Sequence, residues 1–198
     1  GLIQKNDKNK FYDRFRNRIM FPIINEKGTV IGFGGRVIDS EDNPKYYNSP
    51  ETPLFQKSYE LYGLVYARKP IREKSYVLVV EGYMDVVGLA QHGVRNVVAT
   101  LGTATTIYHL KKLMRYTQEI IFCFDGDSAG QKAAWRALMN ALNAITDNVR
   151  LKFLFLPDNH DPDSFIRENS QQDFDTLIDD SLPLTEYVVK YLTIDNDL

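Results

Sequence analysis

The sequence predicts an α/β protein with a central, mainly parallel sheet, preceded by a smaller basic region of mixed α+β structure. Apolar runs at 77–80, 96–100, 119–124 and 150–156 are separated by segments of helical pattern. Strands in parallel sheets have such runs because helices cover both faces of the sheet. We therefore predict four strands, all in the second part of the chain.

Three helices are expected between these strands, over 83–91, 105–116 and 127–145. The last of them repeats small and apolar residues at helical spacing from Ala134 to Ile145, which predicts one buried face. Right-handed crossover connections then bring the carboxyl ends of the strands to one edge of the sheet.

Acidic residues follow three of the four strands at the point where each strand ends. Ligands collect at the carboxyl ends of strands in such sheets, so we expect these side chains to share one site. Carboxylate oxygens suit Mg²⁺ or Mn²⁺, and the repulsion among so many negative groups calls for a cation. Acidic residues also follow strands simply because loops are polar, but agreement among three strands favours a site. The candidate metal ligands are Glu81, Asp85, Asp125, Asp127, Asp161 and Asp163.

Composition limits the class of protein. The 198 residues include 43% hydrophobic and 25% charged residues, which is ordinary for a globular protein, and no apolar run is long enough to span a membrane. Cys123 is the only cysteine, so a disulfide or a zinc site within this chain is excluded and a cytoplasmic setting is expected. We expect Cys123 to be a buried apolar residue.

The net charge of −2 conceals two parts of opposite sign. Residues 1–75 hold 14 Lys and Arg against 9 Asp and Glu, a net +5, whereas residues 76–198 hold 10 against 17, a net −7. A basic part joined to an acidic, metal-binding part suits a polyanionic substrate. A net charge of +5 would by itself be unremarkable.

The basic region has its own signals. Arg14, Arg16 and Arg18 alternate, so in an extended segment they would lie on one side. Two β-rich runs around a turn at 25–28 predict a hairpin. Three prolines in the loop at 43–53 keep it irregular and stiff, as in a binding loop or a mere connector. A helical pattern at 60–68 precedes the predicted boundary at 69–75.

The acidic segments resemble the three motifs of the Toprim domain, the fold shared by bacterial primases, topoisomerases and some nucleases. The similar segments are, in order, EGYMD at 81–85, DGDSAG at 125–130 and DPD at 161–163. The basic region is similar to the subdomain that precedes Toprim in bacterial DnaG-type primases. The stretches that carry this second resemblance are RFRNR at 14–18, FPI at 21–23, GFGGR at 32–36, PKY at 44–46, NSPET at 48–52 and LYG at 61–63.

This resemblance implies a Toprim fold with three parts: a partial basic subdomain at 1–75, a Toprim catalytic domain at 76–166, and the start of a helical subdomain at 167–198. It implies a DNA-templated RNA polymerase that makes short primers on single-stranded DNA by two-metal phosphoryl transfer, with Mg²⁺ or Mn²⁺ held by the six carboxylates. Glu81, Asp125 and Asp127 would be catalytic, with Glu81 either a ligand or the proton acceptor. The groups expected to contact ribonucleoside triphosphate or template are Arg14, Arg16, Arg36, Lys45 and Lys57.

Helicase and single-strand-binding protein would be contacted through regions outside this chain. A Toprim nuclease or topoisomerase fragment, and a non-catalytic nucleic-acid-binding Toprim protein, are the alternative functions. The segment 100–106 would line the site with hydroxyls and N–H groups, or Thr105 would only cap the following helix. We expect His92, His109 and His160 to be surface residues.

Overall fold

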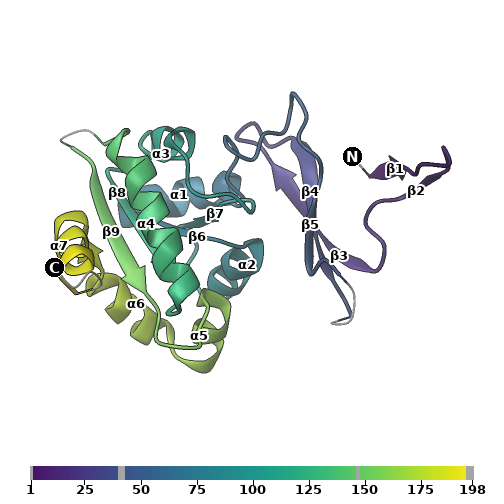
Figure 1. Ribbon diagram of the computed structural model, residues 1–198. Helices are drawn as coiled ribbons and strands as arrows, with labels where there is room; N and C mark the ends of the chain where they lie inside the picture. Colours follow the sequence, from purple (N-terminus) through teal and green to yellow (C-terminus); the bar gives the residue numbers. More distant parts are fainter. Residues whose placement is uncertain (1, 40–42, 146–147, 195–198) are drawn as a thin grey trace.

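The computed structural model describes residues 2–39, 43–145 and 148–194, which form an elongated N-terminal arm and a larger α/β lobe (Figure 1). The lobe is built on a five-stranded sheet with the strand order β10-β9-β8-β6-β7. The four predicted strands are confirmed and run parallel: β6 (Val77–Val80), β7 (Val97–Ala99), β8 (Glu119–Phe124) and β9 (Arg150–Phe155). The two-residue β10 (Leu182–Pro183), which the sequence did not reveal, adds an antiparallel edge beside β9.

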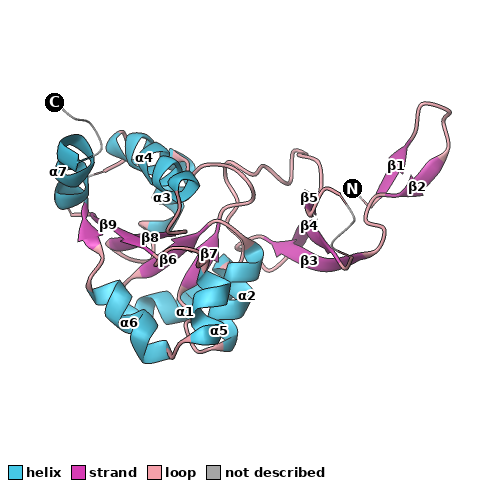
Figure 2. Ribbon diagram, turned by 60° about the horizontal axis from the view of Figure 1, so that its bottom comes forward, coloured by secondary structure: helices cyan, strands magenta, loops and turns pink. Residues whose placement is uncertain are grey.

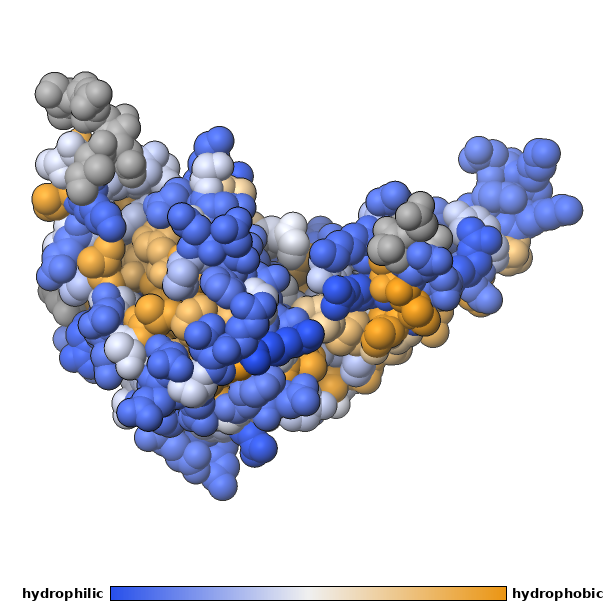
Figure 3. Space-filling view, turned by 90° about the horizontal axis from the view of Figure 1, so that it is seen from below, coloured by the Kyte–Doolittle hydropathy of each residue, from blue (hydrophilic) through white to orange (hydrophobic). Residues whose placement is uncertain are grey.

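Helices cover both faces of this sheet (Figure 2). One face is covered by α3 (Ile107–Leu113), α4 (Ser128–Leu142) and α7 (Leu184–Ile194), and the other by α2 (Tyr83–Gln91), α5 (Pro162–Glu168) and α6 (Gln171–Asp179). α1 (Leu64–Lys74) packs beside the edge strand β7. Among the described residues, no helix combines the length and the apolar character needed to cross a membrane. Figure 3 shows one face of the molecule, on which hydrophobic residues gather in the middle of the lobe and on part of the arm, with hydrophilic residues around them.

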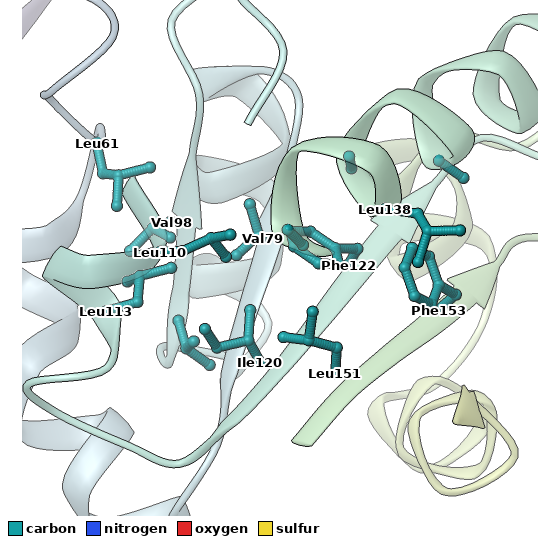
Figure 4. Packing of buried hydrophobic residues seen from close by; sticks show 14 of the residues in the cluster. Leu61, Val79, Val98, Leu110, Leu113, Ile120, Phe122, Leu138, Leu151 and Phe153 are labelled. Atoms are coloured by element: carbon teal, nitrogen blue, oxygen red, sulfur yellow. The ribbon is translucent and has the colours of Figure 1, made fainter. Parts of the chain in front are cut away.

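The alternation of side chains along the strands produces two separate hydrophobic clusters. Val77 and Val79 point to the cluster beneath α3 and α4, whereas Leu78 and Val80 point to the cluster beneath α2 and α5. Figure 4 shows the first cluster, in which Phe122 and Phe153 from adjacent strands pack under Leu138 of α4. Burial on both faces explains why these strands are continuously apolar. Cys123 is buried in the second cluster, as expected.

The observed helices correct two details of the predictions. The predicted helix at 60–68 is displaced: α1 spans Leu64–Lys74 and continues through Pro70, because Ala67 and Ile71, one turn apart, are both buried against the sheet. The N-cap of α3 is Thr106, whose hydroxyl accepts from the His109 N–H at 3.2 Å, so the cap does not fall on Thr105.

His109 is fully buried, so its prediction as a surface residue was wrong. Its Nε2 donates to the Lys57 carbonyl at 2.8 Å, and its Nδ1 accepts from the Thr106 N–H at 3.2 Å. Burial lowers the pKa of His109 to about 4, against the backbone carbonyl of Lys57, which favours the charged form. The neutral ring therefore fastens the loop around Lys57 to the first turn of α3.

The arm consists of two small antiparallel sheets. One contains β3 (Arg18–Ile24), β4 (Val30–Val37) and β5 (Tyr46–Asn48), and its β3–β4 pair is the predicted hairpin. The other pairs β1 (Ile3–Lys5) with β2 (Phe11–Asp13) at the far end of the arm (Figure 1). The extended segment expected through the alternating arginines is interrupted, because residues 14–17 form bends and Asn17 has a φ of 52°.

The turn of the β3–β4 hairpin is fixed to the lobe through Glu26. Its carboxylate accepts from Arg115 Nη2 at 2.8 Å and from the Tyr116 hydroxyl at 2.6 Å, and Lys112 Nζ lies 3.6 Å away. Burial raises the pKa of Glu26, but these three groups outweigh it and leave the pKa below its usual value. Arg68 of α1 also donates to the Glu26 carbonyl, so the arm is held at its hairpin turn.

Candidate active site

A cavity of about 320 Å³ lies where the arm meets the carboxyl ends of the parallel strands. Four of the six predicted carboxylates line it: Glu81, Asp85, Asp125 and Asp161. The arm contributes the opposite wall through Lys45, Tyr46 and Asn48. We call this space the acidic cavity. It brings together residues that are up to 116 positions apart in sequence, from Lys45 to Asp161.

The carboxylates of the acidic cavity repel one another. Burial, together with the charges of Asp161, Asp125 and Asp163, raises the pKa of Asp85 to about 7, although the Gly82 N–H favours the ionised form. Burial likewise raises the pKa of Asp125 to about 6, together with Glu81, Asp161 and Asp127. None of Glu81, Asp85, Asp125 and Asp161 forms an ion pair with a Lys, Arg or His in the described part of the chain.

Three of the predicted metal ligands also hold helix N-termini. Asp127 caps α4 by accepting from the Gly130 N–H at 2.8 Å, and Asp161 caps α5 by accepting from the Ser164 N–H at 2.7 Å. Oδ2 of Asp85 accepts from the Gly82 N–H at 3.0 Å before α2. Each carboxylate is thereby oriented with an oxygen left for another partner. The Asp-Pro pair at 161–162 is a sequence signal of such an N-cap. The motif was predicted only as a source of metal ligands, so this signal was overlooked.

Asp163 has a different environment from the other five. It forms a two-pronged ion pair with Arg167, at 2.6 Å and 3.0 Å, one helical turn further along α5. Its carboxylate packs against Gly88 of α2, where an added Cβ would collide with it. Asp163 does not line the acidic cavity, so the structure gives it a packing role between α2 and α5.

The donor set of the acidic cavity fits a divalent cation with hard oxygen ligands. Within the described residues, no three His, Cys, Asp or Glu side chains are grouped as a preformed metal site. Mg²⁺ does not need such a cage, because it keeps several waters and binds one or two carboxylates together with substrate phosphates. The mutually repelling carboxylates Glu81, Asp125 and Asp161, which have no ion-pair partner in the described part of the chain, are therefore the residues that would hold it. The described residues that line this cavity include neither Cys nor His, the ligands that zinc prefers.

The predicted basic residues fall into separate places on the arm. Lys45 lines the acidic cavity, and the Arg36 guanidinium lies 5.9 Å from the ring centre of its neighbour Tyr46. Arg14 and Arg16 line a groove of about 490 Å³ on the arm. Lys57 lines neither space, and its backbone carbonyl is the acceptor for His109.

Arginines and tyrosines alternate in the arm groove. The Arg14 guanidinium lies 4.2 Å from the Tyr47 ring centre and that of Arg18 lies 5.6 Å from the same ring, while Arg16 lies over Tyr12 at 5.4 Å. Arg14 also donates to the Asn48 carbonyl at 3.3 Å, which links this groove to the acidic cavity. The arginines converge as predicted, but through a bend and aromatic contacts.

Tyr83 joins the acidic motif to the arm. Its ring is buried between Phe21 and Tyr46, and its hydroxyl donates to the Gly35 carbonyl at 3.2 Å. Gly34 is required beside it, because a Cβ there would lie 2.8 Å from the Tyr83 ring. The third residue of the acidic motif thus sets the distance between β4 and the first turn of α2.

A second cavity, of about 350 Å³, also has Glu81 in its wall. Glu81, Thr100 and Gly102 line both cavities. Thr103 and Thr105 supply hydroxyls, Arg136 of α4 supplies a cation, and the floor is apolar. We call this space the threonine cavity. Thr100, Gly102, Thr103 and Thr105 of the segment 100–106 line these cavities, which is one of the two roles expected for it, whereas Arg136 was not predicted. Arg136 lies on the exposed side of α4, outside its buried small and apolar face, so no pattern in the sequence marks it.

Comparison with known proteins agrees with this arrangement. A family model described as DNA primase catalytic core, N-terminal domain, matches residues 1–68, and a Toprim-like model matches residues 78–166. A curated DNA primase of Neisseria meningitidis is 58% identical over 98% of this chain and 32% of its own length. The DNA primase of Legionella pneumophila is 52% identical over 100% of this chain and 34% of its own length. The chain thus spans about a third of these curated relatives.

Solved structures show the same fold. A DNA primase domain from Pseudomonas aeruginosa superposes with a TM-score of 0.94 at 53% identity, covering 100% of this chain and 62% of that one. The DnaG primase catalytic domain bound to single-stranded DNA gives a TM-score of 0.92 at 48% identity, covering 99% of this chain and 63% of that one. Fold and site therefore define a Toprim-type α/β domain with an attached β-sheet arm. Within that class, the chain belongs to the family of DnaG-type DNA primase catalytic cores.

Proposed function

We propose that this chain is the catalytic part of a DNA primase, a DNA-directed RNA polymerase that makes short RNA primers on single-stranded DNA for replication. The observation that carries the proposal is the composition of the acidic cavity. Carboxylates from the Toprim-like part and Lys45, Tyr46 and Asn48 from the primase-type arm line one space. A nuclease or topoisomerase reading accounts for the carboxylates only, since it assigns no role to the arm.

The arm side of the acidic cavity is proposed to hold the incoming ribonucleoside triphosphate. Lys45 supplies a positive charge for its phosphates, and Arg36 lies beside Tyr46, which lines the cavity. Oδ1 of Asn48 is buried without a hydrogen-bond partner among the described residues, although the Nδ2 of the same amide donates to Leu101 at 3.3 Å. An unpaired buried acceptor is costly, so this oxygen is suited to accept from a nucleotide N–H or hydroxyl.

The reaction is nucleotidyl transfer. The 3′-hydroxyl oxygen of the growing strand forms a bond to the α-phosphorus, the bond from that phosphorus to the bridging oxygen breaks, and pyrophosphate leaves. Magnesium, when bound, neutralises the phosphate charge and lowers the pKa of the attacking hydroxyl. Glu81 stands between the two cavities and is placed to orient that hydroxyl or take its proton. Asp125 and Asp161 hold the metal side, and Asp127 fixes α4 beside it.

The wider assignments are proposals of the same kind. We propose the division into residues 1–75, 76–166 and 167–198, with Arg14 and Arg16 on the template side and Lys57 near the nucleotide. Asp85 and Asp163 are kept as candidate ligands, and Asp163 is the weakest of the six because Arg167 already pairs with it. Contacts with a replicative helicase and with single-strand-binding protein would lie outside this chain, in the cytoplasm.

The test is metal-dependent incorporation of labelled ribonucleotides on single-stranded DNA by this chain and by the full-length protein. RNA synthesis that requires Mg²⁺ or Mn²⁺ supports the proposal. Cleavage of the DNA strand without RNA synthesis would instead favour the nuclease reading. DNA binding with neither reaction, in the full-length protein, would favour a non-catalytic Toprim protein.

A further inference from the structure

Two reactants must meet in nucleotidyl transfer, and the structure contains two cavities that meet at one carboxylate. The acidic cavity has a wall of carboxylates and Lys45, which suits a metal-bound triphosphate. The threonine cavity shares only Glu81, Thr100 and Gly102 with it. Molecules bound in the two cavities would therefore both be able to contact Glu81.

The charges of the threonine cavity suit a different ligand from a triphosphate. Arg136 is its one lining cation, and Glu81 is its one lining carboxylate. Arg136 forms no ion pair with an acidic side chain in the described part of the chain, although its charge opposes the effect of burial on the pKa of Glu81. One guanidinium balances one phosphodiester, whereas a triphosphate would meet the Glu81 carboxylate without enough positive charge.

The polar groups of this cavity suit a sugar. Oγ1 of Thr103 is buried and has no hydrogen-bond partner among the described residues, so it is free to bond a ligand hydroxyl. Thr100 and Thr105 add hydroxyls on the same wall. Gly102, with a φ of 76°, turns the loop sharply at the boundary between the two cavities.

The floor of the cavity suits the flat face of a base. Ala133 of α4 is half-buried at this apolar floor, and Phe124 of β8 and Ala137 of α4 lie below it with little exposed surface, above the fully buried Phe122. The cavity volume of about 350 Å³ lies in the range of small-molecule sites. The loop that covers it is anchored on the far side, where Asn140 Nδ2 donates to the Thr105 carbonyl at 2.8 Å.

We propose that the threonine cavity binds the 3′-terminal ribonucleotide of the growing RNA strand, with Thr103 at its ribose hydroxyls and Arg136 at its phosphodiester. This inference deepens the proposed function and rests on it. It gives the growing strand a site separate from the triphosphate site and assigns Thr103 and Arg136 as binding residues for a ribose-containing strand end.

The test measures binding of two probes to the chain in Mg²⁺ buffer: the ribodinucleotide ApA and a non-hydrolysable ATP analogue. Thr103→Val removes the hydroxyl at nearly constant shape, and it should weaken ApA about fivefold, the effect of one neutral hydrogen bond. Arg136→Gln should weaken ApA at least about tenfold, as expected for a charge-assisted bond. Both variants should bind the ATP analogue within about twofold of wild type, the limit set for a residue outside that site.

Controls keep the result specific. Thr103→Ser keeps the hydroxyl and should retain wild-type affinity for ApA, and Thr176→Val and Lys132→Gln repeat the same chemical changes at exposed positions. Amide NMR shifts on adding ApA should centre on Gly102, Thr103 and Ala133. The melting temperature of each variant is measured as well, so that a loss of fold is recognised as such.

The assignment is overturned if the variants weaken the ATP analogue and leave ApA unchanged, because the cavity then belongs to the triphosphate. It is also overturned if wild type shows no ApA binding, or if ApA shifts only distant residues. The proposed function has a separate test: it is contradicted if the full-length protein incorporates no ribonucleotide. If the full-length protein makes RNA but both variants bind ApA as wild type does, only the assignment of the threonine cavity is contradicted.

Discussion

The lobe and the arm place their charged groups in opposite ways. In the lobe, carboxylates stand at the ends of buried strands, and Glu81, Asp125 and Asp161 have no cationic partner among the described residues. In the arm, Arg14 and Arg18 already have protein partners, since both lie over Tyr47 and donate to backbone carbonyls, and only Nε of Arg14 is buried without a hydrogen-bond partner among the described residues of these two side chains. The lobe is therefore built to gain stability from a bound cation, whereas the arm is pre-assembled and gains little from its ligand.

The largest expected effect is on catalysis in the lobe. Asp125→Asn and Glu81→Gln should each lower primer synthesis by about 10²–10³, because each removes a charge aimed at the reacting phosphate or metal. The measurement is ribonucleotide incorporation by the full-length protein. Asp163→Asn is the matched comparison, and its loss should be smaller because Arg167 already neutralises that carboxylate. Near-normal synthesis by Asp125→Asn would contradict the site.

The next effect tests the contact between His109 of α3 and the backbone carbonyl of Lys57. His109 has a folded pKa of about 4 against an ordinary value of 6.5, so below pH 6.5 the unfolded chain binds a proton that the folded chain does not. The stability that comes from the neutral His109 is fully present above pH 6.5. As the pH falls from 6.5 to 4, the free energy of unfolding should decrease by about 3 kcal/mol because of this residue. Urea unfolding of wild type and His109→Gln at pH 7.5 and pH 4.0 measures this loss.

The comparison with His109→Gln is needed because two carboxylates act in the opposite direction. The raised pKa values of Asp85 and Asp125 make the folded chain take up protons first as the pH falls, which stabilises it over the same range. Both proteins share that effect, so it cancels in their difference. A difference in unfolding free energy that stays constant from pH 7.5 to pH 4.0 would mean that His109 is not held neutral.

How far the sequence predicts the molecule also differs between the two regions. In the lobe, the continuous runs gave the four parallel strands, and α2 begins and ends as predicted, because two-sided burial leaves a local pattern. The pattern cannot show β10, which has only two residues, or the burial of His109, which depends on a carbonyl 52 positions away. In the arm, the convergence of the arginines depends on Tyr12 and Tyr47, and no period in the sequence encodes that contact.

In the candidate site, too, features marked by a local sequence pattern were predictable, and those that depend on contacts between distant residues were not. The positions of Glu81, Asp125 and Asp161 were predictable, since each follows a strand whose end must lie at one edge. The different environment of Asp163 was not, because it depends on the approach of α5 to Gly88. Thr103 lies in the segment 100–106 that was expected to line the site, whereas Arg136 escaped prediction because it acts through a cavity formed between α4 and a distant loop.

A cation should stabilise the lobe. A divalent ion that binds only the folded chain adds about 2.7 kcal/mol to the unfolding free energy at a hundredfold excess over its Kd. Adding Mn²⁺ or Mg²⁺ should therefore raise the Tm, whereas NaCl at matched ionic strength should reproduce only a small part through screening. Asp125→Asn should show a smaller shift with metal. An equal Tm shift with NaCl would mean that the carboxylates bind no ion specifically.

A smaller effect separates the two roles of Asp127. Asn is as good an N-cap as Asp, so Asp127→Asn should melt no lower than wild type without metal, because it keeps the bond to Gly130 and removes one repelling charge. Asp127→Ala loses that bond and should be about 1 kcal/mol less stable. Calorimetry of both variants measures the difference. If Asp127→Asn is as unstable as Asp127→Ala, the ionised carboxylate itself holds α4.

The smallest effect concerns the arm and appears in the salt dependence of DNA binding. Arg36→Ala and Lys45→Ala should each reduce the slope of log K against log salt for single-stranded DNA by about 0.7 if the side chain contacts one phosphate. Neither residue lies in the lobe, so the Tm shift with Mn²⁺ should be unchanged. Lys190→Ala, on the exposed side of α7, is the control and should leave the slope unaltered. A contact with the base or with the triphosphate alone would lower affinity or nucleotide binding at constant slope. If the Arg36 and Lys45 variants bind both DNA and nucleotide like wild type at every salt concentration, these two side chains contact neither ligand and are simply solvated. The positive charge that meets a phosphate in the acidic cavity would then have to come from other residues.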